Sequence, residues 1–143
     1  MPFQLLVDQS IIRIDFSGTI SVDDLTALAA EVHELEASMP RVPDRLTDLS
    51  GAVARASTFE LILGMSRRRA ATQFRNPFRS AIVARTPEMV GFARMFKILN
   101  RNPQITIQIF DSVAAAEQWL GVSAPLRVSD SAMATPGQSA ERR

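Results

Sequence analysis

Residues 48–60 read DLSGAVARASTFE, a stretch that contains the pattern of a strand end, a short loop and a helix start. An apolar run leads into Asp-Leu-Ser-Gly, which is typical of a strand that ends at Gly51. After a short loop, Ser57 and Glu60 have the spacing of a capping box, which predicts that a helix begins at Ser57. A helix N-terminus also favours a bound phosphate, because its free N–H groups point outward. The two hydroxyl residues, Ser57 and Thr58, therefore have two interpretations, a helix cap or a phosphorylation site.

The same order of strand and helix occurs twice more downstream. The run SAIVA (residues 80–84) is short and uninterrupted, as expected of a strand that is covered on both faces. Thr86-Pro87-Glu88 then has the composition of a helix start. ITIQIF (residues 105–110) is the last predicted strand, and Gly121 ends the Ala-rich helix that follows it. The helices expected in this half of the chain span residues 57–72, 87–100 and 113–120.

The chain begins with a hairpin pattern. FQLLV (residues 3–7) and IIRIDF (residues 11–16) are apolar runs with three polar residues between them, which predicts two antiparallel strands. Ser21 with Asp24 forms a second capping-box pattern, and apolar residues then follow at helical spacing. The acidic residues of this helix, including Glu36, are interpreted as solvent-exposed.

This order of elements predicts a single α/β domain over residues 1–121. We expect a mostly parallel five-stranded sheet with an N-terminal antiparallel strand and four helices. Residues 122–143 are dominated by Ser, Ala, Pro and Gly without periodicity, which indicates a flexible C-terminal tail.

The composition excludes several classes of function. The 143-residue chain has no Cys, no Tyr and one His, so disulfides and Cys nucleophiles are excluded and a metal site would have few ligands. No apolar run approaches the roughly 20 residues of a membrane-spanning helix, and the N-terminus lacks a signal-peptide pattern. His33 is interpreted as a surface residue without a nucleophile signature nearby. We therefore expect a cytoplasmic, non-catalytic protein without a metal or cofactor.

Acidic and basic residues are segregated along the chain. Residues 1–61 hold ten acidic and four basic side chains, whereas residues 62–101 hold nine basic side chains and one acidic one. Such asymmetry indicates a charged partner, self-association of opposite faces, or an uneven solvated surface. Nucleic acid is not the expected partner, because the chain shows no stacking platform and no recognition motif.

Four sequence features together resemble a known family. FSGTISVDDL follows the hairpin, DLSGA closes the third strand, AIVARTPEMVGFARMF joins the fourth strand to its helix, and ITIQIFDSVAAAEQWL completes the set. In this order they are similar to the SpoIIAA-like branch of the STAS superfamily, the anti-sigma-factor-antagonist fold, over roughly residues 3–121.

The resemblance implies a site for the phosphorylation interpretation. In phosphorylatable antagonists, the second Ser of an Asp-Ser-Ser-Gly motif at the helix start accepts phosphate. That position corresponds to Thr58 here, with Ser57 before it. The flanking residues depart from the motif, because Ala56 replaces Asp and Phe59 replaces the Gly that allows a kinase backbone to approach closely. The helix cap is therefore favoured over the switch, and the partner of a switch would be a regulatory kinase or sigma-factor regulator.

A helix that packs on a sheet needs an apolar arc of only about 100° around its axis. The apolar residues of the second and third expected helices cover a wider arc than this. The SpoIIAA-like branch resembles lipid-carrying Sec14-type folds, which suggests an apolar ligand or a membrane surface for this excess. A homodimer interface is another explanation, and so is mutual packing of the two helices in a larger core. The candidate apolar residues are Met65, Met89, Phe92, Met95 and Phe96, and the candidate anionic-surface residues are Arg67, Arg68, Arg69, Arg94 and Lys97.

From these patterns we predict a SpoIIAA-like binding module, peripheral at a membrane surface or bound to an apolar, lipid-like ligand, and forming a homodimer. The alternative is a signalling antagonist switched by phosphorylation at Thr58 or Ser57.

Overall fold

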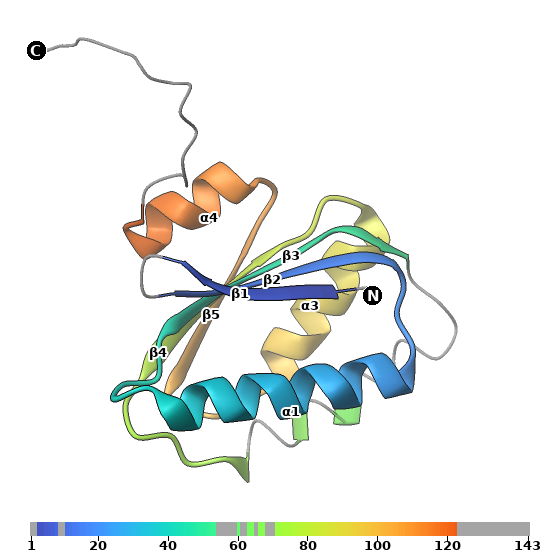
Figure 1. Cartoon of the computed structure of the whole chain (residues 1–143). Coiled ribbons are helices and arrows are strands. Elements are labelled where there is room, and N and C mark those ends of the chain that lie inside the picture. The colour runs from blue at the N-terminus through green and yellow to red at the C-terminus, as the bar shows by residue number, and fades with distance from the viewer. Residues whose placement is uncertain are drawn as a thin grey trace, which may run out of the picture.

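A computed structural model of the chain describes residues 3–8, 11–53, 60, 63–64, 66–67 and 71–122. Five strands have defined bounds in it: β1 (Phe3–Asp8), β2 (Ile11–Thr19), β3 (Asp44–Val53), β4 (Phe78–Val83) and β5 (Ile105–Phe110). Three helices are interspersed with them: α1 (Val22–Ser38), α3 (Pro87–Leu99) and α4 (Val113–Leu120) (Figure 1).

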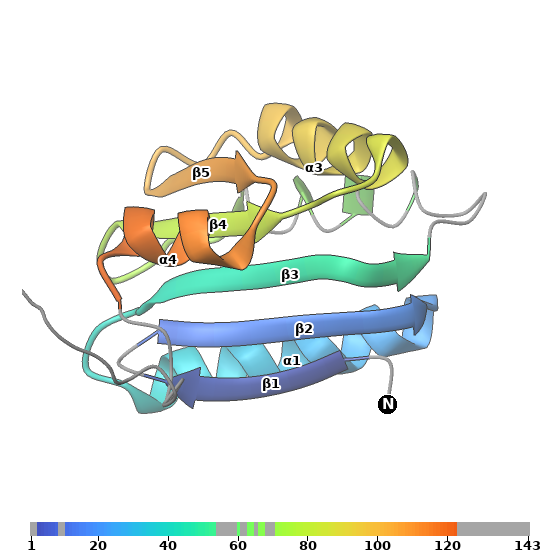
Figure 2. The same ribbon diagram turned by 90° about the horizontal axis from the view of Figure 1, so that it is seen from above.

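The five strands form one sheet in the order β1-β2-β3-β4-β5, which is also their order in the chain. β1 and β2 pair antiparallel, with Phe3 opposite Phe16 and Asp8 opposite Ile11. The pairs β2–β3, β3–β4 and β4–β5 are all parallel (Figure 2). The predicted mostly parallel sheet with one antiparallel N-terminal strand is therefore confirmed.

The two longer helices cover one face of this sheet. α1 contributes Leu25, Leu28 and Val32 to a buried cluster with residues of β1 and β2. α3 contributes Met89 and Ala93 to a second cluster with β4 and β5. Side chains of β3 border both clusters, so α1 and α3 lie on the same face, α1 over the β1–β2 side and α3 over the β4–β5 side (Figure 2).

The opposite face carries the shorter helix α4. Ala116 and Leu120 pack on Leu46 of β3 and on Ala81 and Val83 of β4. In Figure 2, α4 crosses the β3–β5 half of the sheet and leaves β1 uncovered on this side. The two faces of the sheet are thus covered unequally by the described elements.

The helix starts follow the capping chemistry expected from the sequence. Ser21 and Asp24 form the reciprocal capping box of α1, with Ser21 Oγ accepting from the Asp24 N–H at 3.1 Å. Thr86 caps α3 through its side-chain oxygen alone, which accepts from the Met89 N–H at 3.2 Å, and Pro87 follows at the first helical position. Ser112 caps α4, and Gly121 ends it with φ of +73°, a backbone conformation that glycine adopts without strain.

The expected number of helices needs a correction. Within the described residues three helices have bounds, not four. Most of the expected helix 57–72 lies outside those residues, although the described residues Glu60, Leu63, Gly64, Ser66, Arg67 and Ala71 are helical. Residues 123–143, nearly all of the expected tail, lie outside the described residues as well.

The interpretation of Glu36 as solvent-exposed is wrong. Glu36 is 6% exposed and forms an ion pair with Arg45 of β3. Its backbone oxygen also accepts a hydrogen bond from the guanidinium of Arg75. The carboxylate is buried because it lies four residues after Val32, on the helix face that meets the sheet.

Candidate functional site

The α3 helix combines a buried face with an outer face that carries positive charge. Met89 and Ala93 are 6% and 2% exposed and lie in the core. On the outer side, Arg94 and Lys97 are exposed, and Ile98 keeps 68% of its surface accessible. Ile98 is thus a large apolar side chain in solvent, one position from Lys97 and four from Arg94. Positions four apart are neighbours on a helix surface.

The predicted apolar residues of α3 divide into two groups. Phe92, Met95 and Phe96 are half-buried, and Phe92 and Phe96 pack against the core cluster of β4 and β5. Met89 is fully within that cluster, so its side chain is part of the core and not of the helix surface. Of these predicted residues, Met95 alone lies outside the core cluster, and it is three positions from the exposed Ile98.

Several predicted site residues lie outside the described residues. These are Ser57, Thr58, Met65, Arg68 and Arg69. Arg67 is described, helical and exposed. The interpretation of Thr58 or Ser57 as a phosphorylation site stays a prediction.

The aromatic residues around the RNPFR turn belong to the core. Phe74 and Phe78 are both buried, with ring centroids 5.0 Å apart in an edge-to-face arrangement. Asn76 between them is buried and bonds to Val42 through its side-chain oxygen and nitrogen. These contacts fasten the turn to the segment before β3.

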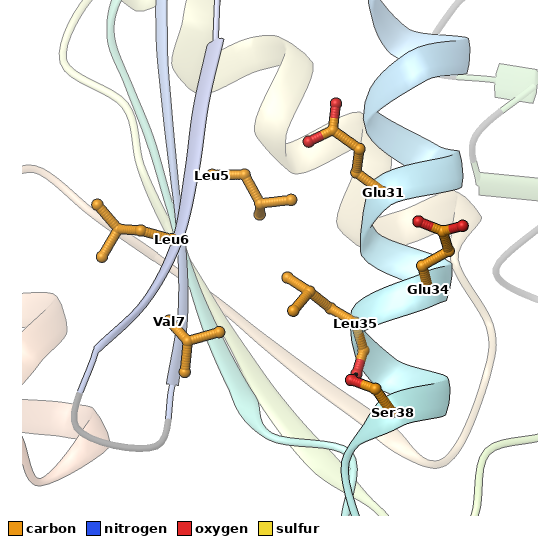
Figure 3. Close-up of a pocket in the computed structure, with 7 residues that line it drawn as sticks. All are labelled: Leu5, Leu6, Val7, Glu31, Glu34, Leu35 and Ser38. Carbon is orange, nitrogen blue, oxygen red and sulfur yellow. Dashed lines mark hydrogen bonds between the residues drawn. The ribbon is translucent and has the colours of Figure 1, made fainter.

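A groove between β1 and α1 was not expected from the sequence. It encloses about 520 Å³ and is lined by Leu5, Leu6, Val7, Glu31, Glu34, Leu35 and Ser38. Figure 3 shows Leu5 and Val7 directed toward α1, whereas Leu6 points to the other side of the strand. The strand side of the groove is thus apolar, and its helix side carries two exposed carboxylates, Glu31 and Glu34.

Two carboxylates meet on the other face of the sheet. Asp15 of β2 and Asp48 of β3 are register partners on neighbouring parallel strands. Partial burial raises the pKa of Asp15, the negative charge of Asp48 raises it further, and Arg13 counteracts both. Asp48 is itself held in place, because its Oδ1 accepts from the Ser50 N–H at 2.9 Å.

An ion-pair network fastens α4 to the sheet. Arg13 of β2 bonds to Asp8 of β1 at 3.0 Å and to Glu117 of α4 at 2.7 Å. At the C-terminal end of α4, Arg79 donates to the backbone oxygens of Trp119 and Leu120 and also pairs with Asp44. Several of the charged residues that are unevenly distributed along the sequence therefore form ion pairs within the domain. Among the described residues, no group of three or more potential metal-ligating side chains is present.

The fold has a counterpart among solved structures. It is similar to the crystal structure of an uncharacterized protein of the DUF3478 family with a SpoIIAA-like fold from Shewanella loihica PV-4. The TM-score is 0.58 at 14% sequence identity, over 82% of this chain and 91% of that chain. The chain has a SpoIIAA-like fold. The fold expected from the ordered sequence features is thereby confirmed.

The SpoIIAA-like likeness concerns the fold and assigns no site residue. No protein-family model matches the chain, and no curated protein matches it. In the part of the chain that the structure describes, no helix is both long and apolar enough to cross a bilayer.

Proposed function

We propose that this SpoIIAA-like domain is a non-catalytic binding module that attaches to anionic, lipid-like surfaces through the outer face of α3. The observation that carries the proposal is the exposure of Ile98, at 68%, on the same helix surface as the exposed cations Arg94 and Lys97. An apolar side chain among basic ones is the pattern of a helix that lies in a membrane interface. Arg67 adds a further exposed cation from the preceding helical segment.

The energy available is that of a weak, reversible association. Each Lys or Arg near an anionic leaflet contributes about 1 kcal/mol. A single Ile side chain contributes roughly 1.5–3 kcal/mol when its apolar surface leaves water completely. The charges would therefore carry much of the affinity, and added salt should weaken it.

The test is sedimentation with phosphatidylcholine vesicles, with and without phosphatidylserine. The variants Arg94→Glu, Lys97→Glu and Ile98→Ser are compared with matched controls outside α3. Arg41→Glu is the charge control, at an exposed position, and Val22→Ser is the apolar control, because Val22 is 58% exposed. We expect each α3 variant to lower the partition coefficient on anionic vesicles by about fivefold or more, while the controls bind like wild type.

Equal binding by all variants, or no preference for phosphatidylserine, would contradict the proposal. Sedimentation velocity without vesicles tests the competing explanation for the same surface. A wild-type dimer that Ile98→Ser converts to a monomer would assign the patch to a second copy of the chain instead of to lipid.

A further inference from the structure

The outer edge of β1 lacks the usual protection of an edge strand. β1 pairs only with β2 among the described elements, in a continuous register from Phe3 to Asp8. Natural edge strands are commonly blunted by Lys, Pro or a bulge. The sequence FQLLVD contains no Lys, Arg or Pro, and its register with β2 shows no irregularity. Among the described elements, nothing else pairs with the free backbone groups of this edge, so we treat it as open to another strand.

β1 has an exposed apolar side chain on each side of the sheet. Leu6 is 46% exposed on the side that α4 leaves uncovered, and Val7 is 44% exposed on the side of α1. Figure 3 shows these two side chains on opposite sides of the strand. The side chains of an added strand would therefore find an apolar β1 residue to contact on each face of the sheet.

The charge around this edge differs between its two sides. On the α1 side, Glu31 and Glu34 are exposed beside the groove, and α1 contains no Lys or Arg at all. On the other side, Asp8 is already paired with Arg13. Uncompensated negative charge is thus concentrated at the groove.

We propose that β1 is a docking edge for an extended segment of a partner protein in which basic and apolar residues alternate. Added as a sixth strand, that segment would place every second side chain over the groove. There, a Lys or Arg can lay its aliphatic stem on Leu5, Val7 and Leu35 and extend its charge to Glu31 or Glu34. The intervening side chains flank Leu6 and are apolar.

A second copy of this chain fits the edge less well. Pairing β1 with β1 around a two-fold axis would place two copies of the acidic α1 on the same face of the joined sheet. Neither helix carries a Lys or Arg that could offset the repulsion. Charge complementarity therefore favours a basic partner over self-association.

The experiment uses the full chain and two defined peptides, acetyl-Lys-Val-Lys-Val-Lys-Val-amide and its Glu-Val counterpart. Fluorescence anisotropy gives the affinities, and amide chemical shifts locate the bound peptide. We expect the basic peptide to bind at least about tenfold more tightly than the acidic one and to shift the amides of Phe3–Asp8. Glu31→Lys/Glu34→Lys should abolish or reverse this preference.

The matched control is Asp23→Lys/Glu88→Lys, which changes the net charge equally at exposed positions outside the groove. Leu6→Lys is a second variant, at an exposed position on the other side of β1, and should also weaken binding of the basic peptide. If the groove variant and the control lose equal affinity, the attraction is only to net charge and the proposal fails. Binding without shifts in β1, or a concentration-dependent dimer that Leu6→Lys abolishes, would likewise overturn it.

Discussion

Gly51 allows β3 to approach β2 closely. A Cβ at this position would lie 2.8 Å from the backbone oxygen of Phe16 on β2. The register between β2 and β3 shifts just there, between Asp15 and Ser17. The glycine of the DLSG stretch therefore has a structural role, close approach of β3 to the irregular part of β2.

Gly51→Ala should therefore destabilise the domain. We expect a loss of about 1–3 kcal/mol in the free energy of unfolding, because the added methyl meets backbone and not a movable side chain. Gly91→Ala is the matched control, since a Cβ there has no neighbour within 4 Å and the residue lies inside α3. It should leave stability unchanged or raise it by up to about 1 kcal/mol. Urea denaturation of the two variants measures both effects, and equal behaviour would contradict this role of Gly51.

The facing carboxylates Asp15 and Asp48 give a prediction about pH. Burial is the first cause of the raised pKa of Asp15 and the charge of Asp48 the second. Asp48→Asn should therefore lower the pKa of Asp15 without returning it fully to the ordinary value of 3.8. NMR titration of the Asp15 side chain measures this, and an unchanged pKa would show that the two carboxylates do not interact.

The sign of the accompanying stability effect follows from linkage. A carboxyl with a raised pKa binds its proton more tightly in the folded state, so its contribution to stability increases as pH falls through the folded pKa. Asp15→Asn should therefore stabilise the protein at pH 7, by about 0.5 kcal/mol or less, because like charges opposite each other in a sheet cost little at an exposed site. The gain should vanish below the unfolded pKa.

α4 depends on a charged contact as well as on apolar packing. The helix has only eight residues, too few to be stable alone. Glu117 is 4% exposed and pairs with Arg13. Removing one partner of a buried ion pair leaves an uncompensated charge, whereas replacing both partners with apolar residues can be nearly neutral.

Because Arg13 would keep its pair with Asp8, Glu117→Leu should cost less than breaking an isolated buried pair, about 1–3 kcal/mol, and the double variant Arg13→Met/Glu117→Leu should recover part of that loss. Amide hydrogen exchange should show the single variant losing protection in α4 before the β1–β2 hairpin. Additive losses in the double variant would mean that the pair acts through packing alone.

The helix α1 shows where sequence reasoning succeeds and where it fails. Its start at Ser21 and its buried face at Leu25, Leu28 and Val32 follow from capping and spacing. Glu36 lies four residues after Val32, so the same spacing would place it on the buried face of the helix. Its charge instead favoured the interpretation that it is exposed to solvent. The buried carboxylate of Glu36 is stabilised by Arg45, which lies on β3. The residue pattern of α1 contains no information about that partner.

For the whole molecule, local patterns predicted the five strands and their parallel or antiparallel pairing. Contacts between distant elements were not predictable in this way. Arg13 and Glu117 are 104 residues apart in the chain, and neither has a flanking pattern that identifies the other. The groove beside β1 has the same origin, because it exists only where α1 crosses an edge strand. The outer face of α3 was partly foreseen, since its excess of apolar residues and its bases were visible in the sequence.

The strand order of the sheet has a consequence for biosynthesis. Every strand after β1 pairs with the strand that precedes it in the chain. Each new strand can therefore pair with one that has already been synthesised. Domains generally form from the N-terminus during synthesis, and contacts between near neighbours form quickly. The exception is Glu117, which reaches Arg13 only after the last helix has been made. Until that moment the growing sheet would keep the α4 side of β3 and β4 uncovered, so this last helix completes the burial of strands made well before it.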